Sequence, residues 1–295
     1  MSSEFHNLCE SVIMNLRKLI RPEGYMAMAL FMAVAAILFF WDPLFTWSAE
    51  KLLAGGDIAT QFAPWPTFIF DSLRQYGELP LWNPYVFSGV PFAANPQTMM
   101  FYPFTYLGLL MPLTRAMALT LVVHVWLAGM GMYGWLRALG ATHAGAFLAG
   151  VAFAFTGTYS LRLGVGQYNV ALQLAWWPLS FWVLRTAFDR RSWRWAILSG
   201  VPLAMGLLSS HATTFLLLGV ALGIYTLFEA VTAYKQNGRW GDGARVLGMM
   251  AVAGVMSAAL AAVQYLPFFF LAGSRRASIR LRSIFRPASR SPSVT

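Results

Sequence analysis

Repeated apolar runs of about 20 residues constrain this chain more than any other feature of its sequence. Runs of that length match a transmembrane helix, whereas the strands of a membrane barrel alternate in units of about 10 residues. Of the 295 residues, 58% are hydrophobic and only 11% are charged, a composition far from that of soluble domains. The sequence therefore predicts an all-α fold, a polytopic bundle of transmembrane helices.

Basic residues before the first apolar run predict its orientation. Three of them lie between Arg17 and Arg21, ahead of a span expected at residues 25–45. Because basic flanks normally stay inside, residues 1–24 are expected to form a cytoplasmic N-terminal segment. Residues 46–100 then form the first extracytoplasmic loop. The chain is expected to be a multi-pass protein of the cytoplasmic membrane.

Residues 99–136 are too long for one ordinary span and short for two spans with a turn. If residues 101–112 crossed the membrane, Arg190, Arg191 and Arg194 would face outward, against the positive-inside tendency. A re-entrant or interfacial segment at 101–112 keeps these arginines inside, and we prefer that alternative, which gives about seven spans. After the first, the spans are expected at 115–137, 144–163, 168–188, 194–210, 212–233 and 246–271.

The transmembrane domain is expected to cover residues 25–273. Residues 274–295 are rich in Arg, Ser and Pro and lack apolar periodicity, which predicts a disordered tail. The preferred topology places this tail outside, where its six arginines from Arg275 onward fit poorly. A truncated C-terminus, a frame-shifted one and a different topology all remain open.

The first part of the outer loop has apolar residues at helical spacing, which predicts an amphipathic helix at the outer interface. These residues are Phe62, Trp65, Ile69, Leu73 and Tyr76. Gly77 is a typical stop signal for such a helix. Residues 79–97 contain four prolines and no charge, so we expect an ordered but irregular loop there. Long loops of this kind are often functional.

Few carboxylates face outward in the preferred topology. They are Asp42, Glu50, Asp57, Asp71 and Glu78. Asp57 differs from the others because two glycines precede it, which allows a close backbone approach, and because Gln61 follows four residues later. Two interpretations stay open for Asp57, an N-cap of the interfacial helix and a general base.

Two further turns are expected on the same side of the membrane as Asp57, at residues 164–169 and 209–213. They contribute Gln167 and His211 to that face. An ionisable residue at membrane depth is a functional candidate, although a histidine in a polar turn is often only a hydrogen-bonding residue.

The remaining titratable residues give weaker signals. His124 lies within a span and His143 on the cytoplasmic side, positions more typical of structural residues. No His or Cys pair has metal-ligand spacing, and the single Cys9 cannot form an internal disulfide. The formal charge of +10 comes from basic residues scattered at span ends, which indicates topology rather than nucleic-acid binding.

Several motifs together resemble the YfhO-like family of bacterial membrane proteins, which is similar to the GT-C superfamily of membrane glycosyltransferases. They are Gly56-Asp57, Gln61, LPLWNPYVFSGVPFAANPQ at 79–97, Tyr102-Pro103, His124 followed by LAGMGMY, and AVQYLP at 262–267. The likeness covers about residues 25–273. Its most specific part is the block from WNP to NPQ.

The resemblance implies an enzyme that takes a sugar from a polyprenyl-phosphate carrier. The acceptor would be a cell-envelope glycan or lipid on the outer side of the cytoplasmic membrane. Asp57 matches the acidic residue of the first outer loop, which acts in such enzymes as a base or beside a metal. A divalent cation is therefore possible, and the lipid bilayer is an obligatory partner.

Other residues are candidates for binding the substrate. Within the matching block these are Gln61, Trp82, Asn83, Asn95 and Gln97. The match leaves open whether they bind substrate or fold the loop. Charge on the leaving phosphate would need donors, for which Gln167, His211, Arg74 or Arg162 could serve.

Two alternatives to the transferase remain. The chain could be a non-enzymatic transporter or assembly subunit, although transporters usually place ionisable groups near the membrane midplane and this chain offers little besides His124 there. It could also be an inactive fragment, because members of the resembled family are usually longer.

Overall fold

The structure, a computed structural model, consists almost entirely of helices. It describes residues 23–46, 56–209 and 211–284, with side chains except at 23, 158–160 and 272–284. Three of the helices described are long and apolar enough to cross a membrane, at Leu113–Ala138, Ala212–Asn237 and Trp240–Leu271. The chain is therefore a helical membrane protein.

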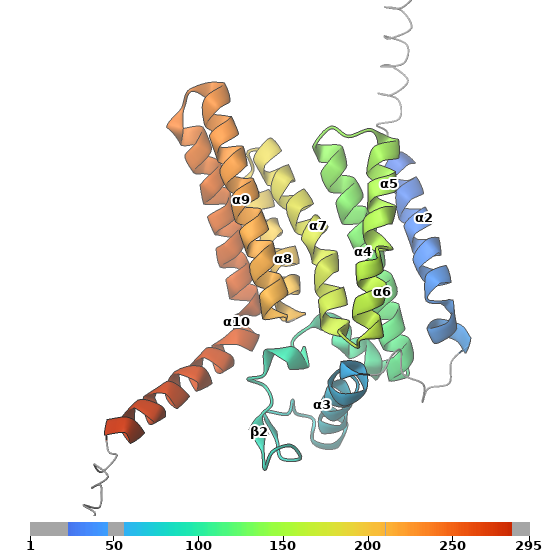
Figure 1. Cartoon of the computed structure of the whole chain (residues 1–295), viewed down its shortest axis with the longest axis vertical. Helices are drawn as coiled ribbons and strands as arrows, with labels where there is room; N and C mark the ends of the chain where they lie inside the picture. The colour runs from blue at the N-terminus through green and yellow to red at the C-terminus, as the bar shows by residue number, and fades with distance from the viewer. Residues whose placement is uncertain (1–22, 47–55, 210, 285–295) are drawn as a thin grey trace, which may run out of the picture.

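Successive helices run up and down beside one another (Figure 1). They are α2 (Glu23–Phe39), α4 (Leu113–Ala138), α5 (His143–Ala154), α6 (Gly157–Gly164), α7 (Tyr168–Asp189), α8 (Trp193–Leu208), α9 (Ala212–Asn237) and α10 (Trp240–Ile284). This alternation brings the α6–α7 and α8–α9 turns to the end of the bundle that carries the first loop, here called the loop end. The α7–α8 and α9–α10 turns lie at the opposite end.

Glycines let α4 pack closely against its neighbours. A Cβ added to Gly131 would lie 2.6 Å from the backbone nitrogen of Leu179 on α7. One added to Gly150 of α5 would lie 2.8 Å from the carbonyl oxygen of Gly129 on α4. Small residues allow such backbone approach between membrane helices. The main core therefore forms around α4, between α2, α5 and α7.

The first loop folds into short elements at the loop end. After η1 (Asp42–Thr46) and a gap in the described residues, they are η2 (Ile58–Phe62), α3 (Pro64–Tyr76), β1 (Trp82–Asn83), β2 (Val90–Pro91), η3 (Pro96–Thr98) and η4 (Pro103–Leu109). The two strands pair antiparallel, with Trp82 opposite Pro91. Apart from this small hairpin, the described loop is helical or irregular, as the prolines predict.

The predicted amphipathic helix of the loop is confirmed. α3 starts at Pro64, where a missing N–H has no cost, and buries Pro66, Ile69 and Phe70. It ends at Gly77, which adopts a left-handed conformation with φ 72°. The helix thus turns one apolar side to the protein and ends where the sequence predicts.

Residues 99–136 contain one short and one long helix. η4 has only 7 residues, far fewer than a crossing requires, and α4 begins at Leu113. Among the described helices, α2, α5 and α8 are apolar but shorter than an ordinary span. The topology of about seven spans stays a prediction.

Two regions of helix differ in detail from what the sequence suggests. The span predicted at 144–163 is divided, because α5 ends at Ala154 and α6 starts at Gly157. The tail predicted to be disordered from residue 274 is helical to Ile284, as the last part of α10. Extending an existing helix requires no new nucleation, and Arg, Ala and Leu all favour helix. Residues 285–295 of the predicted tail lie outside the described part, as do residues 1–22.

Candidate functional site

Asp57 is held against the turn between α6 and α7. Gly56 has φ +57°, and a Cβ there would lie 2.7 Å from the carbonyl oxygen of Val165. Only glycine permits both this conformation and this approach. The half-buried carboxylate of Asp57 accepts a hydrogen bond of 3.3 Å from the Gln61 amide, one helical turn later. The predicted Asp57 and Gln61 therefore form a pair.

The interpretation of Asp57 as the cap of the interfacial helix is wrong. α3 has Ala63 at its N-cap position, with no side-chain hydrogen bond there. Asp57 lies before η2, and its side chain caps no backbone N–H of that element either. Proline in the first turn removes N–H groups that a cap would satisfy. The carboxylate of Asp57 is thus left for another role.

Gln167 lies in the turn that Gly56 contacts. Its side-chain oxygen accepts a hydrogen bond from the Arg162 guanidinium, and its backbone N–H donates to the Arg162 carbonyl at 2.8 Å. The Nε of Arg162 is buried without a hydrogen-bond partner. The turn therefore presents a guanidinium whose donor capacity is only partly used.

His211 is the N-cap residue of α9 and lies at the loop end of the bundle. Its Nδ1 accepts from the backbone N–H of Thr214 at 3.3 Å and from the Thr214 hydroxyl at 2.6 Å. Since Nδ1 accepts, the neutral ring carries its proton on Nε2. Burial, and then the positive charge of Arg162, lower the pKa of His211. His211 is therefore a neutral N–H donor near Arg162.

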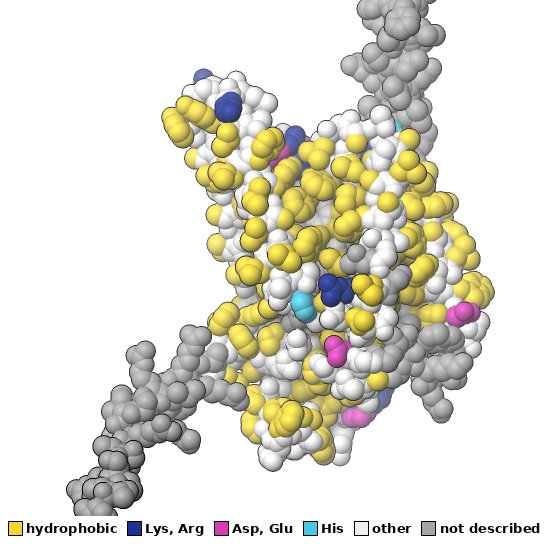
Figure 2. Space-filling view, in the orientation of Figure 1, with side chains coloured by type: hydrophobic (Ala, Val, Ile, Leu, Met, Phe, Trp, Pro, Cys, Tyr) yellow, Lys and Arg dark blue, Asp and Glu magenta, His cyan; other side chains and the backbone are white. Residues whose placement is uncertain are grey.

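These contacts gather polar groups at the loop end. Figure 2 shows a histidine, a basic and an acidic side chain close together there, between the helices and the first loop. The contact of Gly56 with Val165 brings the residue before Asp57 against the α6–α7 turn, which carries Arg162 and Gln167, and the α8–α9 turn with His211 lies at the same end of the bundle. We call Asp57, Gln61, Arg162, Gln167 and His211 the loop-end cluster.

The candidates from the WNP-to-NPQ block serve mainly to fold the loop. Asn83 is buried and accepts from the backbone N–H of Tyr85 at 2.9 Å. Asn95 accepts from the backbone N–H of Gln97 at 3.0 Å and so caps η3. The indole of Trp82 covers Gly89, where a Cβ would lie 2.6 Å from it. Gln97 itself is exposed.

A groove of about 500 Å³ runs between this loop and α10. Its walls are mostly apolar, and the Asn83 and Asn95 side chains are among its lining. Phe268 on α10 closes the other side. The groove reaches Trp65, whose ring packs edge-on against Phe62 of η2, the element that follows Asp57.

A buried network that the sequence did not indicate anchors the loop to the bundle. His124 on α4 hydrogen-bonds through Nδ1 to the Thr120 carbonyl at 2.6 Å and through Nε2 to the Tyr102 hydroxyl. Trp176 on α7 donates to the same hydroxyl at 2.9 Å. Every polar atom of the His124 ring is thus engaged, which agrees with the structural role predicted for it. The side-chain amide of Gln264 on α10 also donates a hydrogen bond of 2.9 Å to the Ala93 carbonyl.

Arg74 fits the site less well than Arg162. Its guanidinium is exposed and lies 3.8 Å from the carboxylate of Asp71, on the outer side of α3.

Among the described residues no group of three or more His, Cys, Asp or Glu side chains could hold a metal ion. A comparison with models of protein families finds no match for this sequence, and a comparison with curated proteins finds none either.

Proposed function

We propose that this chain is a membrane glycosyltransferase of the GT-C type, which moves a sugar from a polyprenyl-phosphate donor to an extracytoplasmic acceptor of the cell envelope. The contact between Gly56 and Val165 carries the proposal, because it brings the residue before Asp57 against the α6–α7 turn, which holds the hydrogen-bonded Arg162 and Gln167. A carboxylate can take the proton of an acceptor hydroxyl, and cationic and neutral hydrogen-bond donors can stabilise the charge of a leaving phosphate. The likeness to the YfhO-like family supports the same reaction.

In this mechanism Asp57 is the general base. Its carboxylate takes the proton of an acceptor hydroxyl while the hydroxyl oxygen forms a bond to C1 of the sugar. The C1–O bond to the phosphate breaks at the same time, polyprenyl phosphate leaves, and the anomeric configuration inverts. Gln61 orients the carboxylate through its hydrogen bond to Oδ1.

The other members of the loop-end cluster stabilise the leaving phosphate. Arg162 supplies a fixed positive charge, and His211 supplies a neutral N–H at Nε2. Charge-assisted hydrogen bonds to phosphate are about twice as strong as neutral ones. The groove beside α10 offers apolar walls and two amides, which suit a sugar-bearing lipid.

The proposal includes an orientation in the cytoplasmic membrane. The chain would cross about seven times with its N-terminus inside, so that the loop end faces outward. A polyprenyl-phosphate sugar presented in the outer leaflet would then meet Asp57 without leaving the membrane surface.

An in vitro assay tests this function. Purified protein in lipid vesicles is incubated with a panel of defined polyprenyl-phosphate sugars and a cell-envelope extract. We expect release of polyprenyl phosphate together with a glycosylated acceptor for one donor. Movement of a lipid-linked sugar across the vesicle membrane without cleavage would instead establish the transporter alternative. The complete engagement of His124 disfavours transport, since both ring nitrogens of this mid-helix residue already have partners within the protein.

A further inference from the structure

A polar pocket of about 430 Å³ lies at the end of the bundle opposite the loop-end cluster. It is formed by the end of α7, the last third of α9 and the start of α10. Its charged lining residues are Arg185, Asp189, Arg191, Glu229, Asp242 and Arg245. None of these residues belongs to the proposed transferase site.

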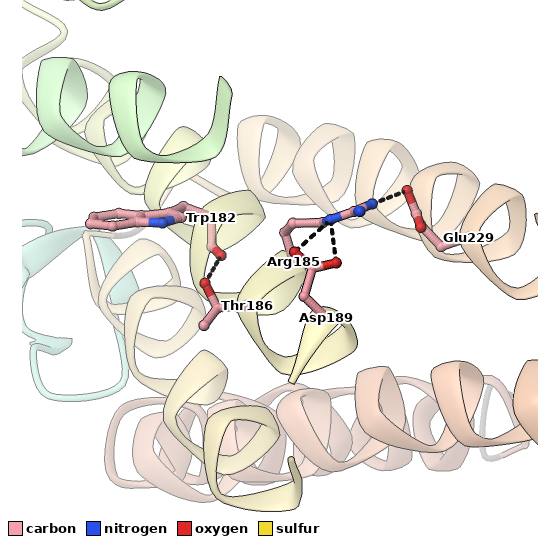
Figure 3. A network of polar contacts seen from close by, with 5 residues as sticks. All are labelled: Trp182, Arg185, Thr186, Asp189 and Glu229. Carbon is pink, nitrogen blue, oxygen red and sulfur yellow. Dashed lines mark hydrogen bonds and ion pairs between the residues drawn. The ribbon is translucent and has the colours of Figure 1, made fainter. Parts of the chain in front are cut away.

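One half of the pocket carries an excess of negative charge. Arg185 on α7 binds Asp189 at 2.9 Å and Glu229 of α9 at 2.7 Å (Figure 3). One guanidinium therefore serves two carboxylates, and the three formal charges sum to one negative charge. Asp189 keeps 42% of its side chain exposed, so it can accept another hydrogen bond.

The other half carries an excess of positive charge. Arg191 binds Asp242 at 3.2 Å, and Asn237 donates to the second oxygen of Asp242 at 2.8 Å. Both oxygens of this carboxylate are therefore engaged. Arg245 is exposed, and it forms no ion pair with any residue of the described part. Its guanidinium leaves one positive charge available at this side of the pocket.

An apolar stripe on α9 continues from the pocket along the bundle. Phe228, which lines the pocket, is 65% exposed. Ile224, Val220 and Leu217 follow at spacings of four, four and three residues, and each of them is also exposed. Helical geometry places these four side chains on one face. A ligand held in the pocket thus has an apolar surface beside it that faces the membrane.

We propose that this pocket binds the headgroup of a phospholipid of the phosphoethanolamine class. The phosphate lies at Arg245 and the ammonium at Asp189 and Glu229, while an acyl chain follows the stripe on α9. A headgroup with both charges matches the two halves of the pocket, whereas a purely anionic headgroup would leave the net negative charge around Arg185 uncompensated. Arginines in pockets between the ends of membrane helices commonly hold lipid phosphates. The stripe identifies a membrane lipid, rather than a soluble zwitterion, as the ligand.

Native mass spectrometry of the purified full-length protein tests this assignment. Phosphatidylethanolamine, phosphatidylcholine and phosphatidylglycerol with identical acyl chains are added in turn. We expect phosphatidylethanolamine to bind at least about tenfold more tightly than the other two, since only its ammonium can donate hydrogen bonds to the carboxylates. Soluble glycerophosphoethanolamine, used as a competitor, should displace the lipid only at much higher concentration.

Variants locate the site. Arg245→Ala should weaken binding of phosphatidylethanolamine about tenfold, whereas Arg239→Ala, in the same α9–α10 turn but outside the pocket lining, should not change it. Glu229→Gln should remove the preference over phosphatidylglycerol. Thermal unfolding of each variant shows whether it is folded. Equal binding of all three lipids, or equal loss in the Arg239 and Arg245 variants, would overturn the proposal, and so would efficient displacement by the soluble competitor.

Discussion

At the scale of single residues, the loop-end cluster depends on Gly56 more than on any charged group. The backbone next to Asp57 packs against the α6–α7 turn because Gly56 has no side chain between its backbone and Val165. The sequence suggested a close approach from the pair of glycines, but it could not identify Val165 as the partner. That contact joins segments more than a hundred residues apart, and no local pattern encodes it.

Gly56→Ala should therefore disable the site. Alanine at this position would have to adopt an unfavourable left-handed backbone conformation, and its Cβ would lie 2.7 Å from the Val165 carbonyl oxygen. We expect the transfer rate of the variant to fall at least about tenfold, because the shift displaces Asp57. The rate is measured in the vesicle assay at saturating donor.

Gly77→Ala is the matched control. Gly77 also has a positive φ, +72°, but a Cβ there meets nothing within 4 Å. Both variants carry the conformational strain, about 1 kcal/mol, and only Gly56→Ala adds the clash. Equal transfer rates in the two variants would contradict the importance of the Val165 contact.

His211 gives a second prediction at this scale, for stability against pH. Burial and the charge of Arg162 hold the pKa of His211 below its usual 6.5, so the unfolded chain binds a proton more readily than the folded one. The contribution of neutral His211 is complete above pH 6.5 and is lost as the pH falls through the lowered folded pKa. Protonation also removes the acceptor that caps α9.

His211→Asn isolates this effect, because asparagine caps helices well and does not titrate. The unfolding temperature of the unchanged protein should fall on acidification below pH 6.5 by more than that of the variant. Parallel pH profiles for the two proteins would show that His211 is not the group responsible.

At the scale of elements, the first loop is fixed to the bundle by buried hydrogen bonds. The Tyr102 hydroxyl connects the segment before η4 to α4 through His124 and to α7 through Trp176. The sequence predicted the amphipathic helix α3 and its stop at Gly77 because both follow from local periodicity and conformation. It did not predict this network, whose members come from three distant segments.

Tyr102→Phe should destabilise the protein by about 1–3 kcal/mol, since it leaves His124 Nε2 and Trp176 Nε1 without a partner in a buried site. Tyr106→Phe is the control, because it removes a single hydrogen bond of 2.6 Å to the Met100 carbonyl from a half-buried position. The difference is measured as the shift in unfolding temperature in one detergent. A larger shift for Tyr106→Phe would contradict the anchoring role of Tyr102.

At the scale of the whole molecule, hydropathy was enough to predict a helical membrane protein, because apolar runs of sufficient length have few other solutions. Hydropathy was less successful in predicting where helices end and where they are interrupted. The interruption at Phe155 and Thr156 and the extension of α10 to Ile284 depend on packing and helix propagation rather than on hydropathy. The predicted grouping of Asp57 with Gln167 and His211 followed from counting spans.

The predicted orientation can be measured directly with cysteine labelling. In a Cys9→Ser background, Tyr85→Cys on the first loop should react with a membrane-impermeant maleimide in cells with a permeable outer envelope. Gln236→Cys, near the α9–α10 turn, should react only after the membrane is opened. Both positions are exposed, so accessibility to solvent is matched. The reverse pattern would invert the topology and place Asp57 inside.

The most direct test of the account is the transfer rate of Asp57→Asn beside that of Asp71→Asn. Both changes remove one carboxylate from the first loop, but Asp71 lies on the exposed side of α3, paired with Arg74. Loss of a general base typically costs about 100-fold or more, so Asp57→Asn should release polyprenyl phosphate at 1% or less of the unchanged rate, while Asp71→Asn stays near it. A normal rate in Asp57→Asn, with the protein inserted and folded, would contradict the account.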